Sequence, residues 1–160
     1  MKHIPIIIGT ALTALLIGCA STPVAVAPIG PNPASLVNAG KNGQLEVFSA
    51  LAGHAEGNNP TWYQHTDYTI YSQQGNVVKH VDNTVGYYAS SPRLISLPPG
   101  KYLVKAEAKD YPTVSVPVVI DPGRITKVHL DDAWRPAQIS KTACVTLPAG
   151  NPVGWSTDAR

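Results

Sequence analysis

The chain has 160 residues, which is enough for one domain and a terminal extension. Only 14% of its residues are charged, and the formal net charge of +2 falls to +1 (11 basic against 10 acidic residues) once a leader containing Lys2 is removed. This balance gives no electrostatic basis for binding nucleic acid. The 13 glycines and 15 prolines favour short strands and turns over long, salt-bridged helices.

Residues 1–18 have the pattern of a secretory leader. Lys2 and His3 precede an apolar stretch that runs from Ile4 to Gly18. That stretch is shorter than the roughly 20 apolar residues of a membrane-spanning helix, and it matches the apolar region of a signal peptide. We expect residues 1–18 to be absent from the mature protein.

The leader ends in the motif LIGC, from Leu16 to Cys19. This motif resembles the lipobox of bacterial lipoproteins, in which the cysteine is acylated and the chain is cut before it. The resemblance implies that Cys19 is the lipidated first residue and that its acyl chains hold the protein on a membrane. Ala20 follows the cysteine, and in enterobacterial lipoproteins a residue other than Asp there goes with sorting to the outer membrane. The implied location is the bacterial envelope, on the outer membrane facing the periplasm. The alternative is an ordinary signal peptide with a chance cysteine.

Residues 19–42 are expected to form a flexible tether behind the lipid. Alanine, proline, glycine and asparagine dominate this segment, and its apolar residues show neither a strand nor a helix period. If it were extended as polyproline II, it would reach on the order of 60 Å.

Residues 43–132 show short runs in which apolar and polar residues alternate, the signature of half-buried strands. Turn sequences around Gly75 and Gly123 separate these runs. The fold class predicted is all-β, a single antiparallel β-sandwich of the prealbumin-like or immunoglobulin-like kind. The residues expected on the inward faces are Leu45, Val47, Ser49, Tyr68, Ile70, Ile95, Leu97, Tyr102, Val104, Ala106, Ala108, Val114, Val116, Val118, Ile120, Thr126, Val128 and Leu130.

Prolines mark two positions in these strands. Pro98 and Gly100, in the sequence LPPG, predict a tight turn that leads directly into the next strand. Pro117 interrupts the run TVSVPVVI, and because proline has no N–H to donate to a ladder, we expect that strand at the edge of a sheet.

The turn and the strands after it form a longer pattern, L-P-x-G-x-Y-x-V-x-A, followed by an aromatic residue, a valine-rich strand and G-x-x-x-x-V-x-L. This pattern resembles the prealbumin-like and carboxypeptidase-regulatory-like β-sandwiches and the related PEGA-type envelope modules. The resemblance implies a sandwich over residues 43–132 in a non-catalytic domain that binds, spaces or stiffens. The residues that carry it are Leu97, Pro98, Gly100, Tyr102, Val104, Ala106, Tyr111, Gly123, Val128 and Leu130.

Motifs for catalysis, metal binding or cofactor binding are not found. The chain has no GxSxG, HExxH or phosphate-binding glycine loop, and its histidines lack zinc-ligand spacing. His80 and Asp82 would project from one strand face, as half a metal site, as a base with its orienting carboxylate or, more simply, as exposed surface. We therefore predict no enzyme activity, no metal and no cofactor. A small periplasmic enzyme, or an enzyme inhibitor acting through an exposed loop, is the alternative, because catalytic carboxylates can meet in space without any sequence motif.

The C-terminal tail, residues 133–160, is expected to add one short strand around Cys144. With Cys19 acylated, Cys144 has no partner within the chain. It is a thiol for an intermolecular disulfide, a reactive thiol or a small buried apolar residue.

Two aromatic segments stand out in a chain with few aromatic residues. Trp62 and Tyr63 lie in PTWYQHTDYTIY, and Tyr87 and Tyr88 lie in VGYYASSP. Tyrosine and tryptophan offer large contact areas at low entropic cost, so we predict that these four residues bind an envelope protein or a glycan. The alternative is a satellite apolar cluster that holds the loops in place.

Overall fold

The structure is a computed structural model that describes residues 24–33, 40–55, 57, 61–84, 91–136 and 143–158. Within these ranges the chain forms thirteen strands and no helix, which confirms the all-β prediction. The strands are β1 (Val24–Ala25), β2 (Ile29–Gly30), β3 (Gly43–Phe48), β4 (Leu51–His54), β5 (Trp62–His65), β6 (Tyr68–Ser72), β7 (Val77–Val81), β8 (Leu94–Leu97), β9 (Gly100–Ala108), β10 (Tyr111–Ile120), β11 (Ile125–His129), β12 (Cys144–Thr146) and β13 (Pro152–Ser156).

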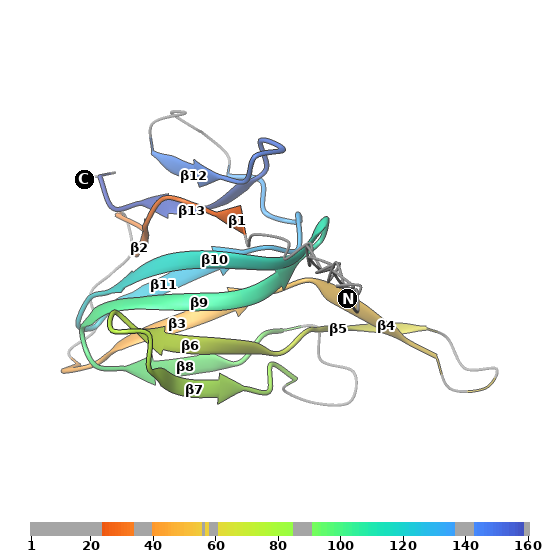
Figure 1. Cartoon of the computed structure of the whole chain (residues 1–160), viewed down its shortest axis with the longest axis horizontal. Coiled ribbons are helices and arrows are strands. Elements are labelled where there is room, and N and C mark those ends of the chain that lie inside the picture. The colour runs from red at the N-terminus through yellow and green to blue at the C-terminus, as the bar shows by residue number, and fades with distance from the viewer. Residues whose placement is uncertain are drawn as a thin grey trace, which may run out of the picture.

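Two sheets and a ribbon make up the described structure (Figure 1). Sheet A has the order β12-β13-β2-β10-β9-β6-β7, with β1 also paired to β10; sheet B has the order β11-β3-β8. Strands β4 and β5 pair only with each other. One core cluster contains side chains from both sheets, an arrangement consistent with a β-sandwich.

The prediction of a purely antiparallel sandwich is wrong, because both sheets contain parallel as well as antiparallel pairs. Strand β11 runs parallel to β3, while β1 and β2 run parallel to β10. Alternation predicts which face of a strand is buried but says nothing about its direction. Only strands joined by a tight turn must be antiparallel, and β3 and β11 are separated by seven other strands.

The alternation of the sequence is confirmed in the core. Leu45 and Val47 of β3, Val104 of β9, Val116 of β10 and Val128 of β11 are fully buried. The turn at Gly75 also forms as predicted, with φ of 83° at that glycine. The period-2 pattern therefore identified the inner faces of both sheets.

The segment expected as a flexible tether is part of the fold between residues 24 and 30. Val24 pairs with Val114 and Ile29 with Val118, so this segment lies along the free side of β10. Ile29 has no exposed surface. The strands are only two residues long, and the prolines around them remove the periodicity that would have revealed them.

Strand β10 is not at an edge, contrary to the expectation from Pro117. The carbonyl of Ser115 accepts a hydrogen bond from the N–H of Val26 at 3.4 Å, so Ser115 directs its backbone groups toward the N-terminal strands. Pro117, two residues later, points its backbone the same way. It meets the break between β1 and β2, where its missing N–H removes no ladder bond.

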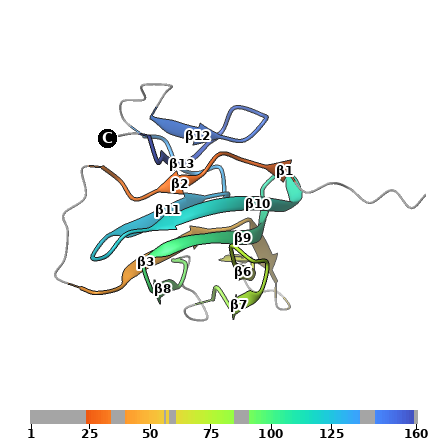
Figure 2. The ribbon, with the colours of Figure 1, turned by 60° about the vertical axis from the view of Figure 1, so that its left-hand side comes forward.

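The C-terminal residues continue sheet A beyond β2 (Figure 2). Trp155 of β13 pairs with Gly30 of β2, and β12 pairs with β13. Gly154 packs on Ile29 so closely that a Cβ at residue 154 would lie 2.5 Å from Cγ2 of Ile29. Cys144 is buried in β12 as a free thiol, and burial raises its pKa. The N-terminal and C-terminal segments thus depend on each other within one sheet.

Candidate functional site

The β4–β5 ribbon extends away from the body of the two sheets (Figure 1). Its root is fixed to sheet A by a hydrogen bond from the N–H of Ala50 to the carbonyl of Glu107 at 2.9 Å. Two side chains on the ribbon are unusually exposed for their type: Leu51 is 46% exposed and Tyr63 is 57% exposed. Large side chains left in solvent on a projecting element are candidates for contact with another molecule.

The two faces of the ribbon carry different side chains. Residues opposite each other in an antiparallel pair share a face, so Tyr63 lies with Gly53, and Trp62 lies with His54. The Tyr63 ring covers Gly53, with Cε1 only 3.2 Å from where a Cβ at residue 53 would stand. On the other face the rings of Trp62 and His54 stack with centroids 6.1 Å apart.

Of the four predicted binding residues, the structure describes two. Trp62 and Tyr63 both lie at the start of β5 but on opposite faces of the ribbon, with Tyr63 exposed and Trp62 partly buried. Tyr87 and Tyr88 lie outside the described residues, as does Cys19. The binding role of all four remains a prediction.

A buried polar group anchors the base of the ribbon. Asn83 donates from Nδ2 to the carbonyl of Val47 at 2.8 Å and to Oγ of Ser49 at 3.0 Å. The Ser49 carbonyl in turn accepts a hydrogen bond from Nδ1 of the buried His65, the last residue of β5, at 2.7 Å. Because buried polar groups are costly when unpaired, these bonds fix the direction in which the ribbon leaves the body.

Five rings contact one another in a row across the outer face of sheet B and onto β13, and we call this row the stack. Phe48 meets the edge of His65 at 5.6 Å and stacks on His129 at 4.4 Å. His129 stacks on Trp134 at 4.8 Å, and Trp134 meets Trp155 at 5.6 Å in an edge-on contact. Both faces of the His129 ring are therefore occupied by neighbours. The described geometry makes this stack a packing layer, since a binding platform needs ring faces open to solvent.

The middle ring of this stack is held neutral. Burial lowers the pKa of His129 to about 4, and the nearby charge of Lys127 and the neighbouring His65 add to the effect. A protonated imidazole between two aromatic rings would lose much of its hydration. The stack is therefore an apolar cover over sheet B at neutral pH.

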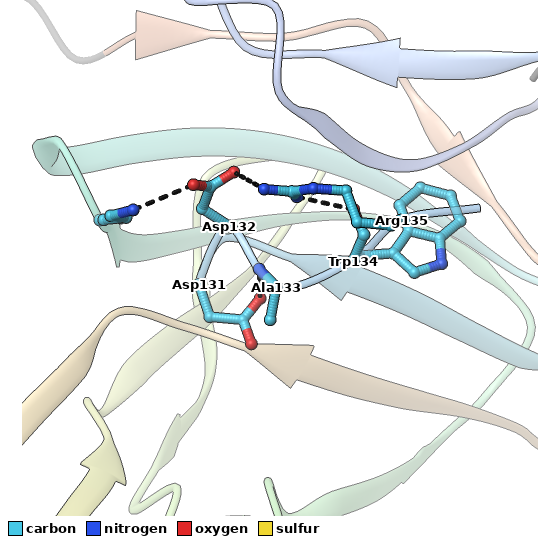
Figure 3. A network of polar contacts seen from close by, with 6 residues as sticks. Asp131, Asp132, Ala133, Trp134 and Arg135 are labelled. Atoms are coloured by element: carbon cyan, nitrogen blue, oxygen red, sulfur yellow. Dashed lines mark hydrogen bonds and ion pairs between the residues drawn. The ribbon is translucent and has the colours of Figure 1, made fainter. Parts of the chain in front are cut away.

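An ion-pair network holds Trp134 in place (Figure 3). Asp132 accepts from Nζ of Lys109 at 3.0 Å and from Nη2 of Arg135 at 3.2 Å. Arg135 also donates from Nη1 to the carbonyl of Trp134 at 3.0 Å. Asp132 itself has φ of 61°, a left-handed conformation that aspartate tolerates better than most residues. The hydrogen bond from Lys109 lowers the pKa of Asp132.

A groove of about 930 Å³ lies on the outer face of sheet A, at the end far from the ribbon. Leu103, Pro117 and Val119 form part of its floor, since they alternate with the core residues of β9 and β10. A second hollow of about 550 Å³ shares Val119 and Thr157 with it. Polar side chains at the rim of the 930 Å³ groove include Gln73, Lys101 and Asp158. Sequence reasoning missed this groove because five separate segments line it.

The other polar pair singled out from the sequence, His80 and Asp82, lines a hollow of about 550 Å³, but the two side chains bond to different partners. The imidazole of His80 is hydrogen-bonded to Thr69, while the carboxylate of Asp82 accepts from the N–H of Thr84. Within the described ranges, no three histidine, cysteine, aspartate or glutamate side chains come together as metal ligands.

Comparisons with protein families, with characterised proteins and with solved structures found no match for this chain. In the part of the chain that the structure describes, no helix has the length and apolar character needed to cross a membrane.

Proposed function

We propose that this protein is a non-catalytic, lipid-anchored binding module of a bacterial envelope, and that its partner is another envelope protein or a glycan. The secretory leader and the lipobox ending at Cys19 support the anchor. Ala20 after the cysteine supports an outer-membrane location with the body in the periplasm. The prealbumin-like or carboxypeptidase-regulatory-like topology is part of the same proposal, supported by the turn that precedes β9.

The groove on sheet A is the observation that carries the binding role. Its volume of about 930 Å³ is within the range of ligand sites, which are mostly apolar with a few polar groups. The floor of Leu103, Pro117 and Val119 supplies the apolar part. Lys101 and Asp158 at the rim supply opposite charges that would orient a ligand. The stacked rings on sheet B support the body and do not compete with this surface.

Cross-linking in living cells tests the groove. A photoreactive amino acid in place of Leu103 should give cross-links to an envelope protein, or the body should co-sediment with isolated peptidoglycan. The same amino acid in place of Thr113, which is exposed on β10 near the other end of the strand, is the matched control. Leu103→Asp should abolish capture while leaving the fold intact, since Leu103 is only partly buried.

Equal cross-linking from residues 103 and 113 would contradict this assignment. So would the absence of both cross-links and co-sedimentation from a folded, correctly located protein. Residues 103 and 113 are on the neighbouring strands β9 and β10. Only residue 103 lines this groove, whereas residue 113 borders a separate hollow, so the comparison tests the groove itself.

A further inference from the structure

The N-terminal end of β1 and the root of the ribbon lie at the same end of the molecule. Val24 pairs with Val114, which pairs with Ala106, so Val24 lies about 10 Å from Ala106 across two strand spacings. The next residue of β9, Glu107, accepts the hydrogen bond from Ala50 at the ribbon root. Because β1 runs parallel to β10, β1 begins at the end of the sheet where the β9–β10 turn lies, and the ribbon leaves the body at that same end.

The chain between the lipid and the body is short. Only four residues, 20–23, separate Cys19 from the first strand. Five residue steps from Cys19 to Val24 reach at most about 18 Å even when fully extended. The four residues of β4 alone carry the ribbon about 14 Å outward before its tip. An anchor at Cys19 therefore keeps the membrane within reach of the ribbon tip.

The composition of the ribbon suits the surface of a bilayer. Between Leu51 and His65 the sequence has one charged residue, Glu56. Tyr63, which is 57% exposed, and Trp62 lie on opposite faces of the ribbon, both at the end of β5 away from the body. Tyrosine and tryptophan are the residues enriched where membrane meets water, because their rings are apolar and their tips are polar. The unpaired outer edges of a two-stranded ribbon keep it at headgroup level, since exposed backbone groups do not enter the hydrocarbon.

We propose that the β4–β5 ribbon rests with the outer edge of β5 on the lipid bilayer that carries the anchor, so that Trp62 on one face and Tyr63 on the other both lie in its interfacial layer. This inference rests on the proposed anchoring at Cys19. The ribbon is a second contact with the membrane, and two contacts fix the orientation of the body where one lipid would not. The groove floor around Leu103 lies toward the opposite end of β9, a strand about 30 Å long, so this orientation turns the groove away from the bilayer.

Quenching of tryptophan emission by brominated lipids tests the contact. The chain from residue 19 onward, carrying Cys144→Ala, is coupled through its single thiol to a maleimide lipid in vesicles of phosphatidylethanolamine and phosphatidylglycerol. Bromine on the acyl chains should quench part of the emission, and Trp62→Phe should remove that quenched part. Trp134 and Trp155 lie in the body and supply an unquenched background.

Two further variants separate membrane contact from a general effect on folding. Tyr63→Asp should reduce the quenching several-fold, because a charge at the interface opposes insertion of the ribbon. Val77→Asp is the matched control: Val77 is 51% exposed beside the distal β6–β7 turn and should leave the quenching unchanged. Circular dichroism should be the same for both variants.

Quenching that is absent in the parent chain, or that persists in Trp62→Phe, would overturn the inference. Photo-cross-links from residue 63 to a periplasmic protein, with no lipid quenching, would assign the ribbon to a protein partner and overturn it as well. Because the lipid is attached chemically, these results do not depend on whether cells acylate Cys19. Failure of the anchor would appear separately, in the mass of the mature N-terminus.

Discussion

Ile29→Ala tests whether the N-terminal strands belong to the fold. Ile29 is fully buried, in a strand two residues long within a segment whose composition resembles a tether. One face of the side chain packs on Gly154 of β13. If the strands belong to sheet A, this single truncation should destabilise the whole domain, although it lies before residue 43 where the regular alternation begins.

The size of the effect follows from what the substitution removes. Isoleucine to alanine deletes three carbons, worth about 2.4 kcal/mol at roughly 0.8 kcal/mol each. A residual cavity adds to this, and measured isoleucine truncations in cores cost about 2–5 kcal/mol. Because β13 can settle partly toward the space left beside Gly154, we expect about 3 kcal/mol.

Urea unfolding of residues 20–160, followed by circular dichroism, measures this loss. With a slope near 1.5 kcal/mol per M, a loss of about 3 kcal/mol lowers the midpoint by about 2 M. Val77→Ala, an apolar truncation at an exposed position, should change stability by less than about 0.5 kcal/mol. If Ile29→Ala behaved like this control, the segment would be a tether after all and the assignment of β2 to the core would be refuted.

Three further predictions concern the body. Folding lowers the pKa of His129 from 6.5 to about 4, so the imidazole is neutral in both the folded and the unfolded chain well above pH 6.5. Between pH 6.5 and 4 the unfolded chain binds a proton that the folded chain does not, so the free energy of unfolding, measured from urea midpoints, should fall by about 1–2 kcal/mol after allowance for solvent. His129→Phe should make this free energy depend less on pH. Asp132→Ala should lower the Tm and shift Trp134 emission to the red, and Asp132→Gly should lower the Tm less because glycine accepts φ of 61°. Val104→Asp should unfold the domain by burying a charge, seen as lost circular dichroism, while Lys105→Asp should cost under about 1 kcal/mol, the value of its contact with an aromatic ring of β6.

The inner faces of the strands were predictable because the signal is local. The spacing of two residues alone predicts that Leu45 and Val47 share a buried face, as do Val104 and Ala106, and no knowledge of the partner strand is needed. Strand direction and sheet membership are not local. Ile29 is buried only because β10 and β13 happen to pass on either side of it, and a strand of two residues between prolines has no period to detect.

The candidate sites divide in the same way. Trp62 and Tyr63 could be selected from the sequence because they are adjacent on one strand, and β5 places them next to each other along the ribbon but on its opposite faces. The stack of Phe48, His129 and Trp134 assembles from residues up to 86 positions apart, so nothing in the sequence marks it. The rings of Phe48, His129 and Trp134 cover the body, the Trp62 ring stacks on His54 of the ribbon, and Tyr63 is exposed. Clustering in sequence therefore identified the projecting aromatic residues and missed the packed ones.

The mass of the mature N-terminal peptide tests most directly the claim that the protein is held on a membrane by a lipid at Cys19. Protein extracted from bacterial envelopes should yield an N-terminal peptide that begins at Cys19 and carries the added mass of acyl chains, while Cys144, which is buried in β12, should be unmodified. Cys19→Ser should release the protein from the membrane fraction. A mature chain that begins at another residue, or an unmodified Cys19 in membrane-free protein, would contradict the anchor and the orientation that depends on it.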